Sequence, residues 1–306
     1  MTRHLLFHRD FREYTGGHGK VWNYFSHAGA HPGWRASVFL TPQSTDQHNP
    51  WSDVPAQVAG SWAPDGASAL FLGGLDWSAY PIDDPAMPVI NLVQGLRHAD
   101  PEQPLHRYLT RRAIRICVSQ AVADAIRATG LVNGPVRVIP AALDLPELPE
   151  TAEPRRGVFI GALKQPALGR ALCERLLAQG REVTLAGHWL PRADYLAQLA
   201  HCRVAVLLPS PSEGFYLPGL EAMALGCATV VPDCTGNREY LQPGRNALVP
   251  AMQLEALVDA VARLDDEQLV AALVAAGRAT SSGFGLGRER ASFHAILDAV
   301  DALWSA

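Results

Sequence analysis

The sequence of 306 residues predicts an α/β protein with two domains, each built around a parallel sheet. Three observations lead to this prediction. Short apolar runs rich in β-branched residues alternate with segments of helical periodicity along the chain. A proline-rich segment divides these runs near the middle. The length also fits two domains, because a domain usually has ~100–200 residues.

Six apolar runs in the first half are short enough to be buried strands. They are Leu5–Phe7, Ala36–Leu40, Ala69–Leu72, Val89–Val93, Ile114–Val118 and Val136–Ile139. Segments with helical patterns separate them, as expected for parallel strands joined by crossover helices. Residues 42–66 are polar and rich in Pro, Gly and Trp, so we expect a long surface loop there.

The dividing segment, residues 140–154, holds four prolines in fifteen residues. This density excludes a helix or a central strand. We therefore predict an N-terminal domain over residues 1–145 and an extended linker over residues 146–155. A C-terminal domain over residues 156–285 and a C-terminal helix over residues 286–306 follow.

Five further apolar runs are predicted strands of the second domain. They are Val158–Ile160, Val183–Ala186, Val204–Leu208, Ala228–Val231 and Ala247–Val249. After them, the tail Glu289–Trp304 carries apolar residues at the spacing of an amphipathic helix.

Composition and charge exclude several classes of protein. With 48% hydrophobic and 18% charged residues the chain is globular, and a net charge of −4 gives no general reason to bind nucleic acid. Lys20 and Lys164 are the only lysines, a usage typical of a GC-rich genome. Five cysteines without C-x-x-C spacing indicate a reducing compartment. No signal peptide or apolar run of about 18 residues is present, so we expect a cytoplasmic protein without a transmembrane segment.

The most informative segment is residues 209–232, which follows a predicted strand. A helix should begin near Pro218 and end at Gly226, with its N-terminus at the sheet edge where α/β folds bind ligands. Glu213 lies in the preceding loop and Glu221 in the helix. Helix N-termini suit phosphate, and carboxylates accept hydrogen bonds from diols, which together indicate a nucleotide-sugar site. Taken alone, Glu221 also fits an acid that complements the helix dipole.

The sequence of Ser212–Gly226, S-E-G-F-Y-L-P-G-L-E-A-M-A-L-G, resembles the E-x7-E signature of the retaining family 4 glycosyltransferases of GT-B type. Asp233–Val249 resembles the segment that follows the signature, while Cys117–Ile126 and Val138–Asp144 resemble the end of that family's N-terminal domain. The resemblance covers most of residues 112–249. It implies two Rossmann-like parallel α/β/α domains that face a cleft, with the C-terminal helix returning to the N-terminal domain.

The resemblance also implies a donor site in the C-terminal domain. Glu213 would contact hydroxyls of the donor sugar, and Glu221 would hold the ribose diol. The backbone that approaches the phosphates and the sugar would be that of Gly214, Phe215, Tyr216 and Leu217. The family usually has glycine where this chain has Tyr216, so we expect a narrower donor site or a different sugar.

A second departure concerns the cations that the family places on the diphosphate. Their positions hold Ala162 and Ala167 here. Lys164 and Arg170 are the nearby cations that can replace them, because a departing nucleoside diphosphate gathers negative charge that must be stabilised. The alternative is that both are solvated surface residues.

A loop after the predicted strand Val89–Val93 carries Arg97 and His98. The family often has a functional polar residue in this loop, frequently histidine. His98 is therefore a catalytic candidate together with Glu213 and Lys164, and Arg97 is a candidate on the acceptor side.

The segment Tyr14–Trp22 is a glycine-rich turn between the first strand and a predicted helix. It matches neither a P-loop nor the G-x-G-x-x-G pattern. In the family this loop faces the cleft, which makes Gly16 and Gly17 donor-binding candidates. His18 and Lys20 are candidates on the acceptor side, unless they are only polar residues at a helix start.

The resemblance implies a bacterial hexosyltransferase of polysaccharide biosynthesis. It would move a sugar from a nucleotide-sugar to a saccharide, lipid-linked or other acceptor, with retention of anomeric configuration. No D-x-D motif occurs, so we expect neither a metal nor another cofactor. A lipid-linked acceptor is compatible with peripheral membrane association. Two alternatives stay open, a non-catalytic nucleotide-sugar-binding or scaffold protein and a sugar-nucleotide epimerase of the same fold.

Overall fold

The structure is a computed structural model that describes residues 2–45, 47–82, 84–146 and 155–305. The chain forms two compact units, Met1–Ala141 with Leu286–Ala306 (unit 1) and Ala142–Gly285 (unit 2). Most of the expected linker, residues 147–154, lies outside the described residues.

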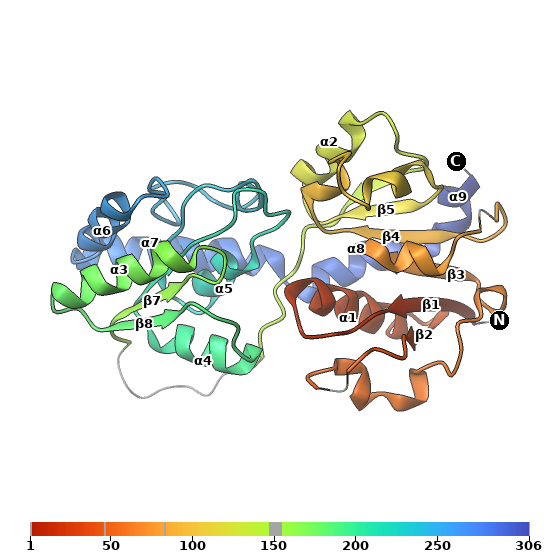
Figure 1. Ribbon diagram of the computed structural model, residues 1–306, viewed down its shortest axis with the longest axis horizontal. Helices are drawn as coiled ribbons and strands as arrows, with labels where there is room; N and C mark the ends of the chain where they lie inside the picture. The colour runs from red at the N-terminus through yellow and green to blue at the C-terminus, as the bar shows by residue number, and fades with distance from the viewer. Residues whose placement is uncertain (1, 46, 83, 147–154, 306) are drawn as a thin grey trace. The chain divides into compact units, whose positions relative to one another are not determined.

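Unit 1 is built on a parallel sheet with the strand order β2-β1-β3-β4-β5-β6 (Figure 1). The strands are β1 (Arg3–Arg9), β2 (Trp34–Leu40), β3 (Ala69–Gly73), β4 (Val89–Val93), β5 (Ile114–Cys117) and β6 (Val136–Val138). The helices of this unit are α1 (Gly16–Gly29), α2 (Gln120–Ala128), α8 (Leu286–Asp298) and α9 (Val300–Ser305). All six strands expected in the first half are confirmed, because each pairs on the sheet, although the edge strand β6 is only partly buried.

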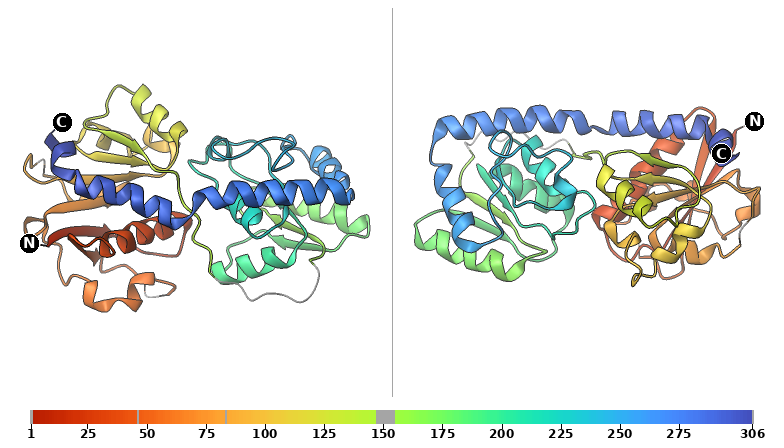
Figure 2. Two further views of the ribbon diagram at one scale, coloured as in Figure 1. Left: turned by 180° about the vertical axis from the view of Figure 1, so that it is seen from behind. Right: turned by 90° about the horizontal axis from the view of Figure 1, so that it is seen from above.

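An aromatic cluster joins β1 and β3 to the helices α1 and α8. The ring of Phe7 stacks on Phe71 with 4.5 Å between centroids and meets Phe25 of α1 edge-on at 5.3 Å. Phe293 of α8 meets Tyr24 of α1 at 4.9 Å. Figure 2 shows α8 (blue) beside α1 (red). The expected return of the C-terminal segment is confirmed, although it forms two helices rather than one.

Unit 2 is built on a smaller parallel sheet with the order β10-β9-β7-β8. The strands are β7 (Val158–Gly161), β8 (Val183–Ala186), β9 (Val204–Leu207) and β10 (Ala228–Val230). The helices are α3 (Pro166–Ala178), α4 (Arg192–His201), α5 (Leu217–Ala224), α6 (Leu254–Arg263) and α7 (Glu267–Ser281). The expected strand Ala247–Val249 is wrong, because its residues form only isolated bridges, Leu248 with Val230 and Ala247 with Pro243. Pro250 follows at once and has no N–H group to continue a ladder.

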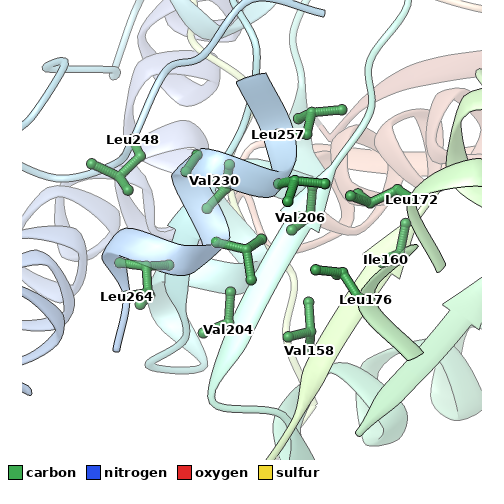
Figure 3. Close-up of a cluster of buried hydrophobic side chains, with 14 of the residues drawn as sticks. Val158, Ile160, Leu172, Leu176, Val204, Val206, Val230, Leu248, Leu257 and Leu264 are labelled. Atoms are coloured by element: carbon green, nitrogen blue, oxygen red, sulfur yellow. The ribbon is translucent and has the colours of Figure 1, made fainter. Parts of the chain in front are cut away.

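The core of unit 2 has two faces because side chains alternate along its strands. Val158 and Ile160 of β7 point into a cluster with α3, α6 and α7, part of which Figure 3 shows. Phe159 points into a second cluster, to which α4 and α5 contribute. Helices therefore cover both faces of the sheet, and the loops after β7 and β9 extend from its carboxyl edge.

Candidate functional site

Two neighbouring strands of unit 2 end at the same edge of the sheet, since Gly161 pairs with Leu207. The loop after β7, residues 162–165, leads into α3, and the loop after β9, residues 208–216, leads into α5. No side chain caps the N-terminus of α5. Its first amide groups therefore suit an anionic ligand. The structure thus places the predicted donor-binding residues on two adjacent loops and one helix start.

Glu213 lies in the loop between β9 and α5 and is half-buried. Its Oε1 accepts a hydrogen bond from the Ser210 amide at 3.4 Å. Gly236 packs closely against this loop, because a Cβ there would lie 2.8 Å from the Glu213 carbonyl oxygen. The Gly236 carbonyl also accepts a hydrogen bond from the Tyr216 amide at 2.9 Å. The loop backbone is thus fixed, while the Glu213 carboxylate makes one long hydrogen bond.

Tyr216 is buried in the apolar cluster beneath α5. Its carbonyl oxygen accepts a hydrogen bond from Tyr240 Oη at 2.6 Å. This contact requires Gly219, where a Cβ would lie 2.3 Å from Tyr240 Oη. Burial raises the pKa of both tyrosines well above the usual value, so both phenols are neutral at physiological pH. A narrower donor site caused by Tyr216 stays a prediction.

Glu221 lies in the second turn of α5 and is only 2% exposed. Arg192, the first residue of α4, places Nη1 2.8 Å from Glu221 Oε1. The Arg192 Nη2 donates a hydrogen bond to the Asp144 carbonyl at 2.8 Å. The buried carboxylate therefore has a positioned cationic partner. Arg192 was not predicted from the sequence, although it is the first residue of the helix after β8, and the carboxyl end of β8 lies beside that of β7.

Lys164 and Arg170 are both exposed, in the loop after β7 and on α3. Neither forms an ion pair with a residue that the structure describes. Ala162, by contrast, is fully buried against α3. A Cβ added at Gly169 of α3 would lie 2.2 Å from the Ala162 Cβ. Position 162 therefore has no room for a cation directed toward α3. The exposed cations Lys164 and Arg170 lie instead in the loop after β7 and on α3.

The glycine-rich turn of unit 1 begins helix α1 at Gly16. Thr15 caps this helix, with Oγ1 accepting a hydrogen bond from the His18 amide at 3.3 Å. Gln94, which follows β4, donates a hydrogen bond from Nε2 to the Gly17 carbonyl at 3.1 Å. The structure thus brings the glycine turn against the loop that carries Arg97 and His98.

The side chain of His18 contacts Arg9, which in turn contacts Asp76, and neither charged residue was predicted from the sequence. Arg9, the last residue of β1, lies with Nη2 3.1 Å from His18 Nδ1. Its other terminal nitrogen, Nη1, donates to Asp76 Oδ2 at 2.7 Å. Asp76 belongs to a short 3-10 helix (Gly74–Ala79) directly after β3. The signal available in the sequence was the position of both residues at carboxyl ends of predicted strands.

Arg97 and His98 are adjacent in the chain but differ in burial. Arg97 is exposed, whereas His98 is 5% exposed. Burial, together with the positive charges of Arg97 and Arg115, lowers the pKa of His98 to about 4. His98 is therefore a neutral imidazole at physiological pH, and its buried side chain is poorly placed to contact a ligand directly.

Lys20 lies in the second turn of α1 and is 4% exposed. Its Nζ is 2.9 Å and 3.1 Å from the two carboxylate oxygens of Glu289, which belongs to α8. His27 Nε2 lies 3.0 Å from Glu289 Oε2. Lys20 thus joins α1 to α8 in a buried ionic cluster. Its contact with an acceptor stays a prediction, one that would require this cluster to rearrange.

Within the described ranges, no three His, Cys, Asp or Glu side chains gather as candidate metal ligands. None of the helices described there is long and apolar enough to span a membrane.

A family comparison identifies the region around the two glutamates. Residues 141–267 match the model of the family described as "Glycosyl transferases group 1". The match runs from the segment before β7 to the start of α7 and includes both Glu213 and Glu221. Curated protein sequences give no match to the chain.

Three solved structures illustrate which known folds this chain is similar to. Sucrose-phosphate synthase from Thermosynechococcus elongatus aligns with a TM-score of 0.71 at 14% identity, over 98% of this chain and 99% of that chain. Anabaena Alr3699/HepE in complex with UDP-glucose aligns with a TM-score of 0.74 at 16% identity, over 97% and 100%. A protein described as a UDP-N-acetylglucosamine 2-epimerase from Listeria monocytogenes aligns with a TM-score of 0.66 at 14% identity, over 98% and 96%. At these identities the likeness shows the fold.

Proposed function

We propose, from the match of residues 141–267 to the glycosyl transferases group 1 model, that the chain transfers a sugar from a UDP-sugar to a saccharide or lipid-linked acceptor with retention of configuration. One observation carries this proposal. Glu213, Glu221 and the start of α5 lie together at the carboxyl edge of the unit 2 sheet. UDP as the nucleotide is supported by the Anabaena protein, which has been solved with UDP-glucose and with UDP.

The two glutamates divide the donor between them. The half-buried Glu213 accepts hydrogen bonds from hydroxyls of the sugar, since its carboxylate makes a single long contact within the protein. Glu221 accepts hydrogen bonds from the ribose diol through the oxygen that Arg192 does not hold. Arg192 fixes the direction of this carboxylate and offsets the cost of burying it. The amides of Gly214 to Leu217 approach the diphosphate at the helix start.

The leaving UDP is stabilised by protein cations rather than by a metal. Lys164 and Arg170 are the exposed cations near this edge, so their charges are available to the diphosphate. Stabilising the charge that develops on the leaving group lowers the barrier. In unit 1, Gly16 and Gly17 are the candidates for donor contacts, and His18 and Arg97 are the candidates for acceptor contacts. The departing phosphate accepts the acceptor's proton, which requires positioning more than a protein base.

The experiment that tests this proposal measures UDP and UDP-glucose binding by calorimetry and by thermal shift. At 100 times its dissociation constant, a ligand of the folded state raises stability by about 2.7 kcal/mol. Hydrogen bonds to a charged group contribute about 1.5–3 kcal/mol each, so E221Q should weaken UDP binding by about ten- to a hundredfold. Unchanged affinity in folded E221Q would refute the assignment of the ribose to Glu221.

The matched control is E255Q, which makes the same chemical change at an exposed carboxylate. Glu255 of α6 pairs with Arg175 of α3 at 2.9 Å, and neither residue belongs to the β9–α5 loop. We expect UDP affinity to be unchanged in this variant. Transfer is then followed as UDP release with a panel of saccharide and lipid-linked acceptors, with and without EDTA. Proton NMR of the new linkage reports its anomeric configuration.

Two alternative functions predict different outcomes of the same assays. The Listeria neighbour favours an epimerase, which would convert UDP-N-acetylglucosamine into its 2-epimer without any acceptor. The alanines at positions 162 and 167 favour a non-catalytic binding protein, which would bind UDP-glucose without releasing UDP. Acceptor-dependent UDP release would exclude both.

A further inference from the structure

Arg9 and Asp76 form a buried ion pair at the carboxyl edge of the unit 1 sheet. Their side chains are 13% and 6% exposed. Asp76 Oδ2 also accepts a hydrogen bond from the Gly73 amide at 3.1 Å, and Oδ1 lies 3.2 Å from His8 Nδ1. A Cβ at Gly73 would lie 3.1 Å from Arg9 Nη1, so the guanidinium is enclosed as well as paired. Both groups of the pair are therefore fixed in position.

The second terminal nitrogen of Arg9 determines the tautomer of His18. A guanidinium has only donors, so its Nη2 must donate the hydrogen bond to His18 Nδ1 at 3.1 Å. Nδ1 is then the acceptor nitrogen, and in a neutral imidazole the proton lies on Nε2. This order differs from an aspartate–histidine pair, in which the carboxylate accepts from Nδ1 and leaves Nε2 as a base. With a guanidinium inserted, Nε2 becomes a donor.

The surroundings of His18 keep the imidazole neutral. Burial and the charge of Arg9 lower its pKa to about 4, although the carboxylates of Asp76 and Asp10 act in the opposite direction. Phe11 packs edge-on against the ring at 4.9 Å. The charged groups that face the imidazole thus come from the end of β1 and from the segment after β3. Between pH 5 and 8 its hydrogen-bonding pattern does not change.

The Nε2 nitrogen has no acceptor among the described residues, and it is not one of the buried unpaired atoms, so solvent reaches it. It lies on the first turn of α1, next to Gly16 and Gly17. We propose that Asp76 positions Arg9, and Arg9 positions His18, so that His18 Nε2 donates a hydrogen bond to a hydroxyl or phosphate oxygen of a substrate. The tautomer stands on the contacts alone, whereas the role in transfer rests on the proposed function. Arg9 and Asp76 are positioning residues and do not touch the substrate.

The tautomer is measured by nitrogen NMR of the histidine side chains in the intact chain, with H18Q used to assign the signals. We expect His18 to be unprotonated at Nδ1 and protonated at Nε2 at every pH from 5 to 8. R9M removes the donor and should move the titration of His18 toward pH 6.5 or populate the other tautomer. R12M is the matched control, because Arg12 pairs with exposed Asp10 instead, and it should leave the tautomer unchanged. A protonated Nδ1 in the wild-type chain overturns the proposal without reference to activity.

The substrate contact is measured with H18A and H18Q, which leave the Arg9–Asp76 pair in place. Three quantities are compared: the affinity for UDP, the affinity for UDP-glucose, and kcat/KM for the acceptor. H18A should lower at least one of them about tenfold, as expected for a lost hydrogen bond. Equal losses for UDP and UDP-glucose indicate a phosphate oxygen, and a loss for UDP-glucose alone indicates a sugar hydroxyl. A loss only in kcat/KM for the acceptor indicates an acceptor hydroxyl.

H18Q should recover much of the loss, because its amide nitrogen reaches the place of Nε2. If the wild-type chain binds UDP but H18A changes none of the three quantities, this proposal and the acceptor role of His18 fail, while the donor site proposed in unit 2 stands. If the wild-type chain does not bind UDP, the proposed function fails, and the NMR result still decides the tautomer.

Discussion

At the carboxyl edge of the unit 1 sheet, Arg9 and Asp76 are buried and lie 2.7 Å apart. At the corresponding edge of unit 2, Lys164 is exposed and makes no ion pair with a described residue. Burying an ion costs several kcal/mol, and the attraction within the pair offsets this cost only when the two groups are well positioned. A buried pair therefore holds its side chains in fixed positions. An exposed lysine keeps its charge available to a ligand. In unit 1 a buried ion pair therefore fixes the geometry of the sheet edge, whereas in unit 2 we propose that an exposed cation binds a ligand.

The strongest test of this contrast compares the two lysines of the chain. Lys20 is buried against Glu289, so K20M would remove the lysine cation from a buried carboxylate that His27 also contacts. Removing one partner of a buried pair costs about 3–5 kcal/mol. We expect the free energy of unfolding in urea to fall by this amount, whereas K164M should change it by less than about 0.5 kcal/mol.

A second variant separates the loss of a pair from the loss of packing. In K20M/E289L both partners are apolar, and a buried pair replaced in this way often recovers its stability. Recovery of most of the loss is expected. If K20M alone is as stable as the wild-type chain, the pair does not stabilise unit 1 and the contrast between the units fails.

The strands of both sheets could be predicted because a buried strand is a short run of apolar, often β-branched residues that can be recognised in the local sequence. Val204–Leu208 was expected and β9 runs over Val204–Leu207, since a β-branched apolar run between two helical patterns has few other solutions. Helix α5 was expected near Pro218 and begins at Leu217. The C-terminal tail was expected as one helix, but Ala299 separates α8 from α9.

The ionic contacts of the candidate sites could not be predicted in the same way. Lys20 and Glu289 are 269 residues apart, and no periodicity links them. Arg9 reaches His18 only because β1 and α1 bring their ends together, and Asp76 joins them through the neighbouring strand β3. Spacing and resemblance placed Glu213 and Glu221 on one loop and helix. The partner of Glu221, Arg192, required the fold.

The second prediction concerns pH and the buried His98 of unit 1. Its pKa is about 4 in the folded chain and 6.5 in the unfolded chain. Between these values the unfolded chain binds the proton and the folded chain does not, so stability falls as pH is lowered from 6.5 to 4. Above pH 6.5 the contribution is constant. The expected loss from this one group is about 3 kcal/mol.

The measurement compares urea unfolding of the wild-type chain and of H98Q at pH 7, 5 and 4. Glutamine does not titrate, so the variant should lose about 3 kcal/mol less than the wild-type chain over this range. Both chains have the same carboxylates, so the carboxylate contribution cancels when the two plots of unfolding free energy against pH are subtracted. Parallel slopes would show that His98 is not held neutral by its surroundings.

The smallest effect is expected for the exposed cations of unit 2, and it should appear in turnover rather than stability. On the proposed function, K164M and R170M would each remove a charge that stabilises the diphosphate in the transition state, so we expect kcat for UDP release to fall about tenfold, or 1.4 kcal/mol. Urea unfolding should change by less than about 0.5 kcal/mol. R175M is the matched control on α3, because Arg175 is exposed like Arg170 but pairs with Glu255. If R175M lowers kcat as much as R170M, the effect comes from general surface charge, and unit 2 has no dedicated cation at its edge.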